Sequence, residues 1–210
     1  MDDFVAFLRD WKELIGAVIG GIFSLLVALL VAYQARRSEE KTAATLLIGE
    51  FLRVHAMVHY AGSRVQEQEL TPEQQSHLLA ERLCRFRVKL SPLFDASIAR
   101  VMHCDVYLAG TMVLASSLIR DTEPVLERLG EDVAALHRGE QPKRNEATID
   151  ADINVVTSGY ELIALHSQHS ARLLETIVLS AFPSWHKLRR RLAPTEPDQQ
   201  LFALLKRGRA

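Results

Sequence analysis

The sequence has none of the short motifs that mark common catalytic centres. It contains no Gly-x-Ser-x-Gly elbow, no phosphate-binding glycine loop, no dinucleotide fingerprint and no His-Glu-x-x-His zinc motif. Its two cysteines, Cys84 and Cys104, do not form a Cys-x-x-Cys pair, and we expect reduced core thiols if they face the cytoplasm. These absences leave an enzymatic activity without support and predict no cofactor.

A strong charge of either sign is also missing, because 25 basic and 26 acidic residues give a net charge of −1. Nucleic-acid-binding proteins usually carry a basic excess over one face, so the composition predicts no nucleic-acid partner. With 48% hydrophobic and 24% charged residues, the chain matches neither a disordered protein nor a multi-span transporter. Its 210 residues suit one ordinary domain plus an additional segment, and leave no room for a second full enzyme domain.

The additional segment is an apolar stretch without any charged residue, residues 14–33. A helix of this length rises about 30 Å, which matches the hydrocarbon core of a bilayer. Trp11 and Tyr33 place an aromatic ring near each interface. A cleaved signal peptide would need a basic start, a shorter apolar run and a small-x-small cleavage site, and the sequence has none of these. We therefore expect a tail of residues 1–13, one retained transmembrane helix and the lipid bilayer as a partner.

The basic residues beside this stretch predict its orientation, because lysine and arginine are preferentially kept in the cytoplasm. Arg36, Arg37 and Lys41 follow the stretch, whereas Arg9 and Lys12 precede it. The acidic N-terminal tail is short and easy to translocate. We expect the N-terminus outside and the C-terminal domain in the cytoplasm, which in a bacterium means a protein of the inner membrane.

Small residues recur at every fourth position of the apolar stretch and form one stripe along its helix. Such a stripe lets two helices approach closely, as in Gly-x-x-x-Gly dimers. It predicts self-association as a homodimer or another helix contact, although small residues are also common in membrane helices. The stripe consists of Gly16, Gly20, Ser24, Ala28 and Ala32.

Residues 34–182 show few strand signals, and their prolines and glycines fall where helices would start or stop. This pattern predicts an all-α domain, an antiparallel helical bundle with short connections. The first helix continues out of the membrane, because apolar residues keep the four-and-three spacing of a packed or coiled-coil helix. These seam residues are Leu47, Phe51, Val54, Val58, Ala61 and Val65.

Capping residues and prolines predict the later helix boundaries. Thr71 and Gln74 form a capping box, and Gly139 suits a left-handed cap. Residues 106–119 are too short for a second span and are expected to be a core helix instead. The expected helices are residues 72–90, 92–120, a further helix from the interruption at 121–124 to 138, and a long helix 148–182 that Pro183 ends.

Two groups of polar residues are candidates for a metal or ligand site. His55 and His59 lie one helical turn apart, a spacing that can ligate zinc or iron, but the repeated Glu-x-x-His of di-iron bundles is missing. The seam of the last bundle helix turns polar at Ser167 and Ser170, beside His166 and His169. Asp105 and His103 likewise interrupt the apolar face of the third helix. These four His and Asp residues could pair structurally, line a ligand pocket or hold a metal.

The C-terminal tail, residues 183–210, has a net charge of +5 and can form short amphipathic helices. It could contact anionic lipid or a partner, or it could be an ordinary solvated helix end that packs on the acidic body. The residues expected to make such contacts are Lys187, Arg189, Arg190 and Arg191.

Three hypotheses for the function remain open at the level of sequence. The first is a membrane-anchored helical interaction or scaffold protein without catalytic activity, which docks a protein partner. The second is a ligand- or signal-responsive bundle that uses the His and Asp polar layer. The third, with less support, is a metal-dependent membrane-associated enzyme.

Overall fold

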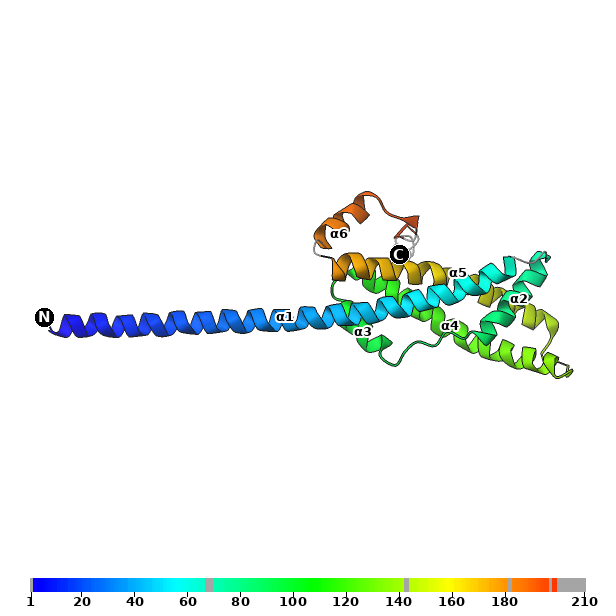
Figure 1. Cartoon of the computed structure of the whole chain (residues 1–210), viewed down its shortest axis with the longest axis horizontal. Coiled ribbons are helices and arrows are strands. Elements are labelled where there is room, and N and C mark those ends of the chain that lie inside the picture. Colours follow the sequence, from blue (N-terminus) through cyan, green and yellow to red (C-terminus); the bar gives the residue numbers. More distant parts are fainter. Residues whose placement is uncertain (1, 67–69, 142–143, 181–182, 197, 200–210) are drawn as a thin grey trace, which may run out of the picture. The chain divides into compact units, whose positions relative to one another are not determined.

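A computed structural model of the protein describes residues 2–66, 70–141, 144–180, 183–196 and 198–199. Within these ranges the chain forms helices and no strand, which confirms the predicted all-α class (Figure 1). The elements are α1 (Asp2–Gln66), α2 (Pro72–Arg85), α3 (Phe94–Val101), α4 (Val106–His137), α5 (Glu146–Leu173), the π-helix η1 (Leu174–Leu179) and α6 (Pro183–Leu192).

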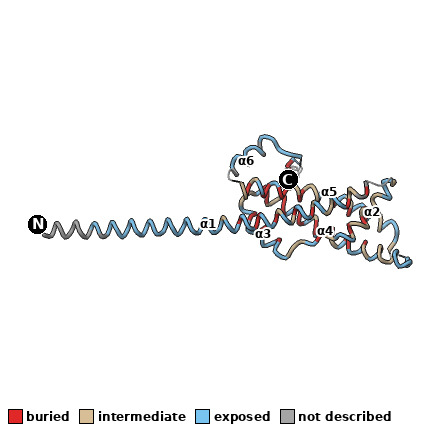
Figure 2. The backbone as a smooth tube through the Cα atoms, in the orientation of Figure 1, coloured by how far each residue is buried: buried red, intermediate tan, exposed pale blue. Residues whose placement is uncertain are grey.

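The chain divides into two compact units, residues 1–42 and residues 43–210. The first unit consists of the N-terminal part of α1, and residues 14–33 within it are exposed throughout (Figure 2). By length and composition, α1 is the one helix in the described ranges that could cross a membrane. Beyond this stretch, Arg36 and Arg37 pair with the carboxylate of Glu40 at 3.1 and 3.3 Å.

The second unit begins with the remainder of α1, whose apolar seam is buried as the spacing predicts. Phe51 and Val54 are completely buried, and Val58 is partly buried against the apolar cluster that contains Val54. This half of α1 therefore buries one stripe of side chains and leaves the opposite face to solvent, as expected for a bundle helix.

The centre of this unit is the pair α4 and α5, which run side by side in opposite directions (Figure 1). Helix α2 packs against both of them, and α6 packs against η1. Two apolar clusters fill the interior. The first cluster contains Phe51, Leu108 and Leu174, and the second cluster contains Leu83 and Tyr160. The predicted helical bundle is therefore present, with its core along the α4–α5 pair.

Two predicted caps are confirmed. The Thr71 hydroxyl accepts a hydrogen bond from the Gln74 N–H at 3.3 Å, and the Gln74 side chain accepts one from the Thr71 N–H at 3.1 Å. This reciprocal pair satisfies two backbone donors at the start of α2. Gly139 follows the end of α4 with φ 74°, a left-handed conformation that favours glycine.

The predicted break in the third helix is in the wrong place. The chain leaves helical geometry between α3 and α4, where Asp105 caps α4 by accepting hydrogen bonds from the Tyr107 and Leu108 N–H groups at 3.0 Å. Helix α4 then continues without interruption through Pro124. Proline removes one backbone hydrogen bond, but the next residue, Val125, is buried in the second cluster, and this packing retains the helix.

Two other helix ends also differ from the prediction. Helix α2 ends at Arg85 rather than Leu90, and residues 87–91 beyond it have no regular secondary structure, with Val88 buried. The last bundle helix widens into η1 at Leu174 before Pro183, and Pro183 then begins α6. Proline suits a first helical position because its missing N–H would have no helical partner there. Residues 106–119 belong to α4 and contribute buried side chains to the core, as expected.

Candidate functional site

The seam of α5 becomes polar between the two apolar clusters, as its spacing predicts. Ile163 belongs to the second cluster and Leu174 to the first. Between them, Ser167 and Ser170 are both 0% exposed, and His166 is 2% exposed. The serines thus occupy core positions where apolar side chains would complete one continuous core.

Three buried polar atoms of this layer have no hydrogen-bond partner among the described residues. They are His166 Nδ1, Ser167 Oγ and Ser170 Oγ. Burial, followed by the neighbouring His169, lowers the pKa of His166, so the neutral imidazole is the favoured form. Since leaving a buried polar group unpaired costs about 1–3 kcal/mol, packing alone does not account for the layer.

His169, a further buried polar residue of α5, is paired with Asp198 of the segment after α6. Its Nε2 lies 3.1 Å from Asp198 Oδ1, and the side chains of both residues are buried. The second carboxylate oxygen accepts hydrogen bonds from the Thr195 N–H at 2.9 Å and the Thr195 hydroxyl at 2.8 Å. The Tyr107 hydroxyl, from α4, donates to the backbone carbonyl of Asp198. These contacts attach the segment after α6 to the bundle.

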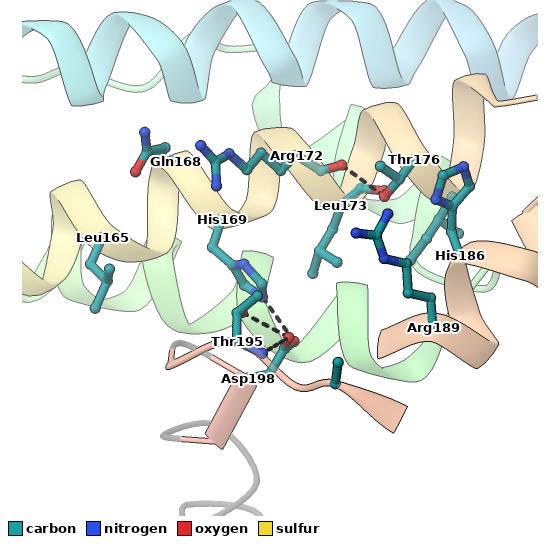
Figure 3. Close-up of a pocket in the computed structure, with 12 residues that line it drawn as sticks. Leu165, Gln168, His169, Arg172, Leu173, Thr176, His186, Arg189, Thr195 and Asp198 are labelled. Atoms are coloured by element: carbon teal, nitrogen blue, oxygen red, sulfur yellow. Dashed lines mark hydrogen bonds and ion pairs between the residues drawn. The ribbon is translucent and has the colours of Figure 1, made fainter. Parts of the chain in front are cut away.

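A pocket of about 430 Å³ lies between α5 and η1 on one side and α6 with the following segment on the other (Figure 3). The His169–Asp198–Thr195 cluster forms part of its wall, and Arg172 and Arg189 contribute from α5 and α6. The volume falls within the range of about 300–1,000 Å³ that is typical of small-molecule sites. The complete lining is Leu165, Gln168, His169, Arg172, Leu173, Thr176, Ile177, His186, Arg189, Ala193, Thr195 and Asp198.

The π-helix η1 supplies one side of this pocket. Thr176, which lines the pocket, donates its hydroxyl to the Arg172 carbonyl at 2.8 Å and approaches the Leu173 carbonyl at 3.3 Å. A π-helix widens the turn and leaves the regular hydrogen-bond ladder, and such turns frequently occur at functional sites. No sequence signal predicts this widening.

The other residues of the predicted polar layer lie elsewhere. Asp105 caps the start of α4, and His103 is exposed in the turn before it, with Nε2 3.9 Å from Cys104 Sγ. Neither Asp105 nor His103 lines the pocket. The structure thus brings His166 and His169 to one turn of α5 and gives Asp105 a local role in helix capping.

The candidate metal ligands His55 and His59 have ring centroids 6.1 Å apart in an edge-to-face arrangement. His55 Nδ1 lies 3.2 Å from the Ala164 carbonyl, so one ring nitrogen is engaged with the backbone of α5. Among the described residues, no third His, Cys, Asp or Glu forms a metal-binding group with these two. The arrangement joins α1 to α5 and supplies two potential nitrogen ligands, fewer than a structural zinc site needs.

The remaining sequence candidates lie at the two ends of the chain. In the basic tail, Arg189 is exposed and lines the pocket. The side chains of Lys187, Arg190 and Arg191, and residues 200–210, lie outside what the structure describes. In the small-residue stripe, a Cβ atom added at Gly16 or Gly20 would meet nothing within 4 Å, so this face of α1 is open.

A second pocket of about 290 Å³ lies between α2, α4 and α5 and is mostly apolar. Cys84 lines it, and burial raises the pKa of this thiol, which disfavours the reactive thiolate. At the edge of the pocket, buried Asp132 pairs with Arg144, whose Nε lies 2.7 Å from Asp132 Oδ2. These groups stabilise the loop before α5.

Sequence reasoning missed Asp198, Thr195 and Arg172. The pattern Thr195-x-x-Asp198 is a capping signature of the same kind as the one at Thr71, and it could have predicted the turn. Nothing in the sequence indicates that Asp198 reaches α5. No protein-family model, curated protein or solved structure matches this chain, so the site is interpreted from its own geometry.

Proposed function

We propose that this protein is a single-pass membrane protein whose N-terminal helix anchors a cytoplasmic helical interaction module without catalytic activity. The observation that carries this proposal is the exposed apolar surface of residues 14–33, where large side chains such as Phe23 at 68% remain exposed. An apolar surface of this extent is unfavourable in water and favourable in a bilayer. In this arrangement Arg36 and Arg37 lie on the cytoplasmic side of the span.

Membrane insertion and orientation can be tested with single cysteines in a variant that lacks Cys84 and Cys104. We expect Asp3→Cys to react with a membrane-impermeant maleimide in intact cells, and Arg138→Cys to react only after lysis. We also expect the chain to stay in the membrane fraction after carbonate extraction. Release by carbonate, or labelling of Arg138→Cys in intact cells, would contradict the proposal.

Self-association through the small-residue stripe is part of the same proposal. Its open face at Gly16 and Gly20 would let a second copy approach closely. We expect Gly16→Ile with Gly20→Ile to reduce crosslinking of the full chain in membranes. Gly21→Ile is the matched control, because Gly21 also has open space but lies off the stripe. If Gly21→Ile reduces crosslinking as much as the double variant does, the stripe is not a specific dimer face.

A second candidate function, a ligand- or signal-responsive bundle, is favoured by the buried polar layer. Ser167, Ser170 and His166 carry unpaired atoms between two apolar clusters, a position where polar groups destabilise the bundle unless something else binds them. A small displacement of α5 along this layer would change the packing of the α4–α5 pair. Serine-to-alanine variants in this layer test the idea, because a bound native hydroxyl would make its removal destabilising.

A further inference from the structure

The pocket between α5, η1 and α6 carries an excess of basic groups. Arg172 and Arg189 enter its wall from two different helices, and both are exposed residues. Neither guanidinium group has a hydrogen-bond or ion-pair partner among the described residues. His186 and His169 also line the pocket. A guanidinium group offers five donors in a planar fork, the geometry that suits carboxylates and phosphates.

The carboxylate of Asp198 in the pocket wall does not neutralise the two arginines, because both of its oxygens already have partners. Asp198 Oδ1 faces His169 Nε2, and Oδ2 accepts two hydrogen bonds from Thr195. Asp198 is also 1% exposed, so it presents little surface to a ligand in the pocket. Arg172 and Arg189 therefore supply the net charge that an incoming ligand meets.

Apart from the polar residues Gln168 and Thr176, the rest of the wall is apolar. Leu165, Leu173 and Ile177 contribute from α5 and η1, and Ala193 contributes from the segment after α6. A free inorganic anion would leave these side chains uncovered. An anionic group attached to a short apolar chain would satisfy both parts of the wall, with its charge at the arginines.

We infer that this pocket binds an amphipathic anion, a phosphate or carboxylate group carried on an apolar chain, with Arg172 and Arg189 as the anion-binding residues. The site belongs entirely to residues 165–198, so it does not depend on the proposed membrane anchor. Lipid headgroups and soluble organic phosphates share this chemistry, and the experiment separates these two sources.

The test uses the full chain in phosphatidylcholine nanodiscs, with hexyl phosphate as the probe and hexanol and inorganic phosphate as comparisons. We expect hexyl phosphate to bind saturably by calorimetry, more tightly than either comparison. Arg172→Gln combined with Arg189→Gln should weaken binding by about tenfold or more, since it removes two charge-assisted contacts. Arg138→Gln is the matched control, an exposed arginine paired with exposed Glu140, and should leave the affinity unchanged.

Further variants and lipids decide how the result is read. Arg172→Lys combined with Arg189→Lys keeps both charges and should retain a preference for hexyl phosphate over hexanol, which separates lost recognition from misfolding. In nanodiscs that contain phosphatidylglycerol, weaker hexyl phosphate binding would identify a lipid headgroup as the ligand, and unchanged binding would identify a soluble anion. The inference is overturned if hexyl phosphate does not bind, binds no better than hexanol, or binds the double glutamine variant as tightly as the unchanged protein.

Discussion

His169 of α5 and Asp198, 29 residues further along the chain, meet through ring Nε2 and carboxylate Oδ1 at 3.1 Å in a buried environment. An imidazole that donates to a carboxylate from Nε2 carries its proton there, in either the neutral tautomer or the charged form. The Tyr107 hydroxyl donates a hydrogen bond to the backbone carbonyl of the same aspartate. Asp198 therefore attaches the segment after α6 to the bundle through both its side chain and its backbone carbonyl.

Replacing Asp198 with alanine should detach this segment. The substitution removes the carboxylate that faces the buried His169 Nε2 and the acceptor of the two Thr195 donors, and losing the partner of a buried group costs about 1–3 kcal/mol. We expect residues 193–199 to lose protection in hydrogen–deuterium exchange, while α4 and α5 stay protected. Exchange mass spectrometry of the full chain measures this difference by segment.

The control for this variant is Asp95→Ala. Asp95 pairs with Arg120, but its side chain is 71% exposed, and exposed ion pairs contribute about 0–1 kcal/mol. Its removal should leave the exchange pattern of residues 193–199 unchanged. If Asp198→Ala gives the same pattern as Asp95→Ala, the buried contact does not hold the segment.

Replacing Ser170 with alanine should stabilise the protein. The serine hydroxyl is fully buried without a partner, and alanine removes this unpaired group and has a higher helix propensity. We expect the free energy of unfolding to rise by about 1 kcal/mol or more from these two effects. Chemical denaturation of the full chain in detergent measures the change, and Ser167→Ala should behave alike.

Ser116→Ala is the matched control, because Ser116 is also buried in the α4 helix but its hydroxyl donates to the Val113 carbonyl at 2.8 Å. Removing the Ser116 hydroxyl should leave the free energy of unfolding unchanged or lower it slightly. A loss of stability in Ser170→Ala that exceeds the loss in Ser116→Ala would show that the Ser170 hydroxyl is bound in the native state. That result would favour the ligand-responsive function.

Asp105 should tolerate other capping residues. Since it accepts the Tyr107 and Leu108 N–H groups, Asp105→Ser and Asp105→Asn should keep the cap, whereas Asp105→Ala should lower the free energy of unfolding by about 1 kcal/mol. Denaturation curves of the three variants test this ranking. Equal destabilisation by all three would show that the negative charge, rather than capping, is required at this position.

The sequence predicted those features of the fold that depend on local spacing. The seam from Leu47 to Val65 and the polar positions Ser167 and Ser170 follow from the periodicity of one helix, the Thr71 capping box follows from residues three positions apart, and the structure confirms all of them. Asp105 was misread because a polar residue within an apolar pattern can either interrupt a helix face or cap a new helix. Pro124 was misread because packing around Val125 outweighs the local cost of proline.

The candidate site was less predictable because it joins distant segments. His169 could be named from the sequence, but its partner Asp198 and the pocket residue Arg189 are brought to it by the return of α6 along η1. Periodicity assigns residues to a helix face and contains no information on which segment covers that face. The pocket is formed by this return, and local pattern does not encode it.

His166 should make the stability of the bundle depend on pH. Because burial and His169 lower its pKa below the ordinary value of 6.5, the unfolded chain binds a proton in weakly acidic solution that the folded chain does not. Stability should therefore be fully present above pH 6.5 and fall as the pH decreases below that value. His166→Gln removes the titrating group, so its stability should fall less steeply over the same range.

The measurement is the difference in unfolding free energy between the unchanged protein and His166→Gln, taken at several pH values from 8 to 5. The substitution leaves every other histidine in place, so the difference between the two proteins isolates the contribution of position 166. Protonation of His166 in the folded state would place a positive charge beside His169, in a layer where His166 Nδ1 has no hydrogen-bond partner among the described residues. Acid should therefore destabilise the native state at this position. A difference that stays constant across this range would show that His166 does not titrate differently in the folded and unfolded chains.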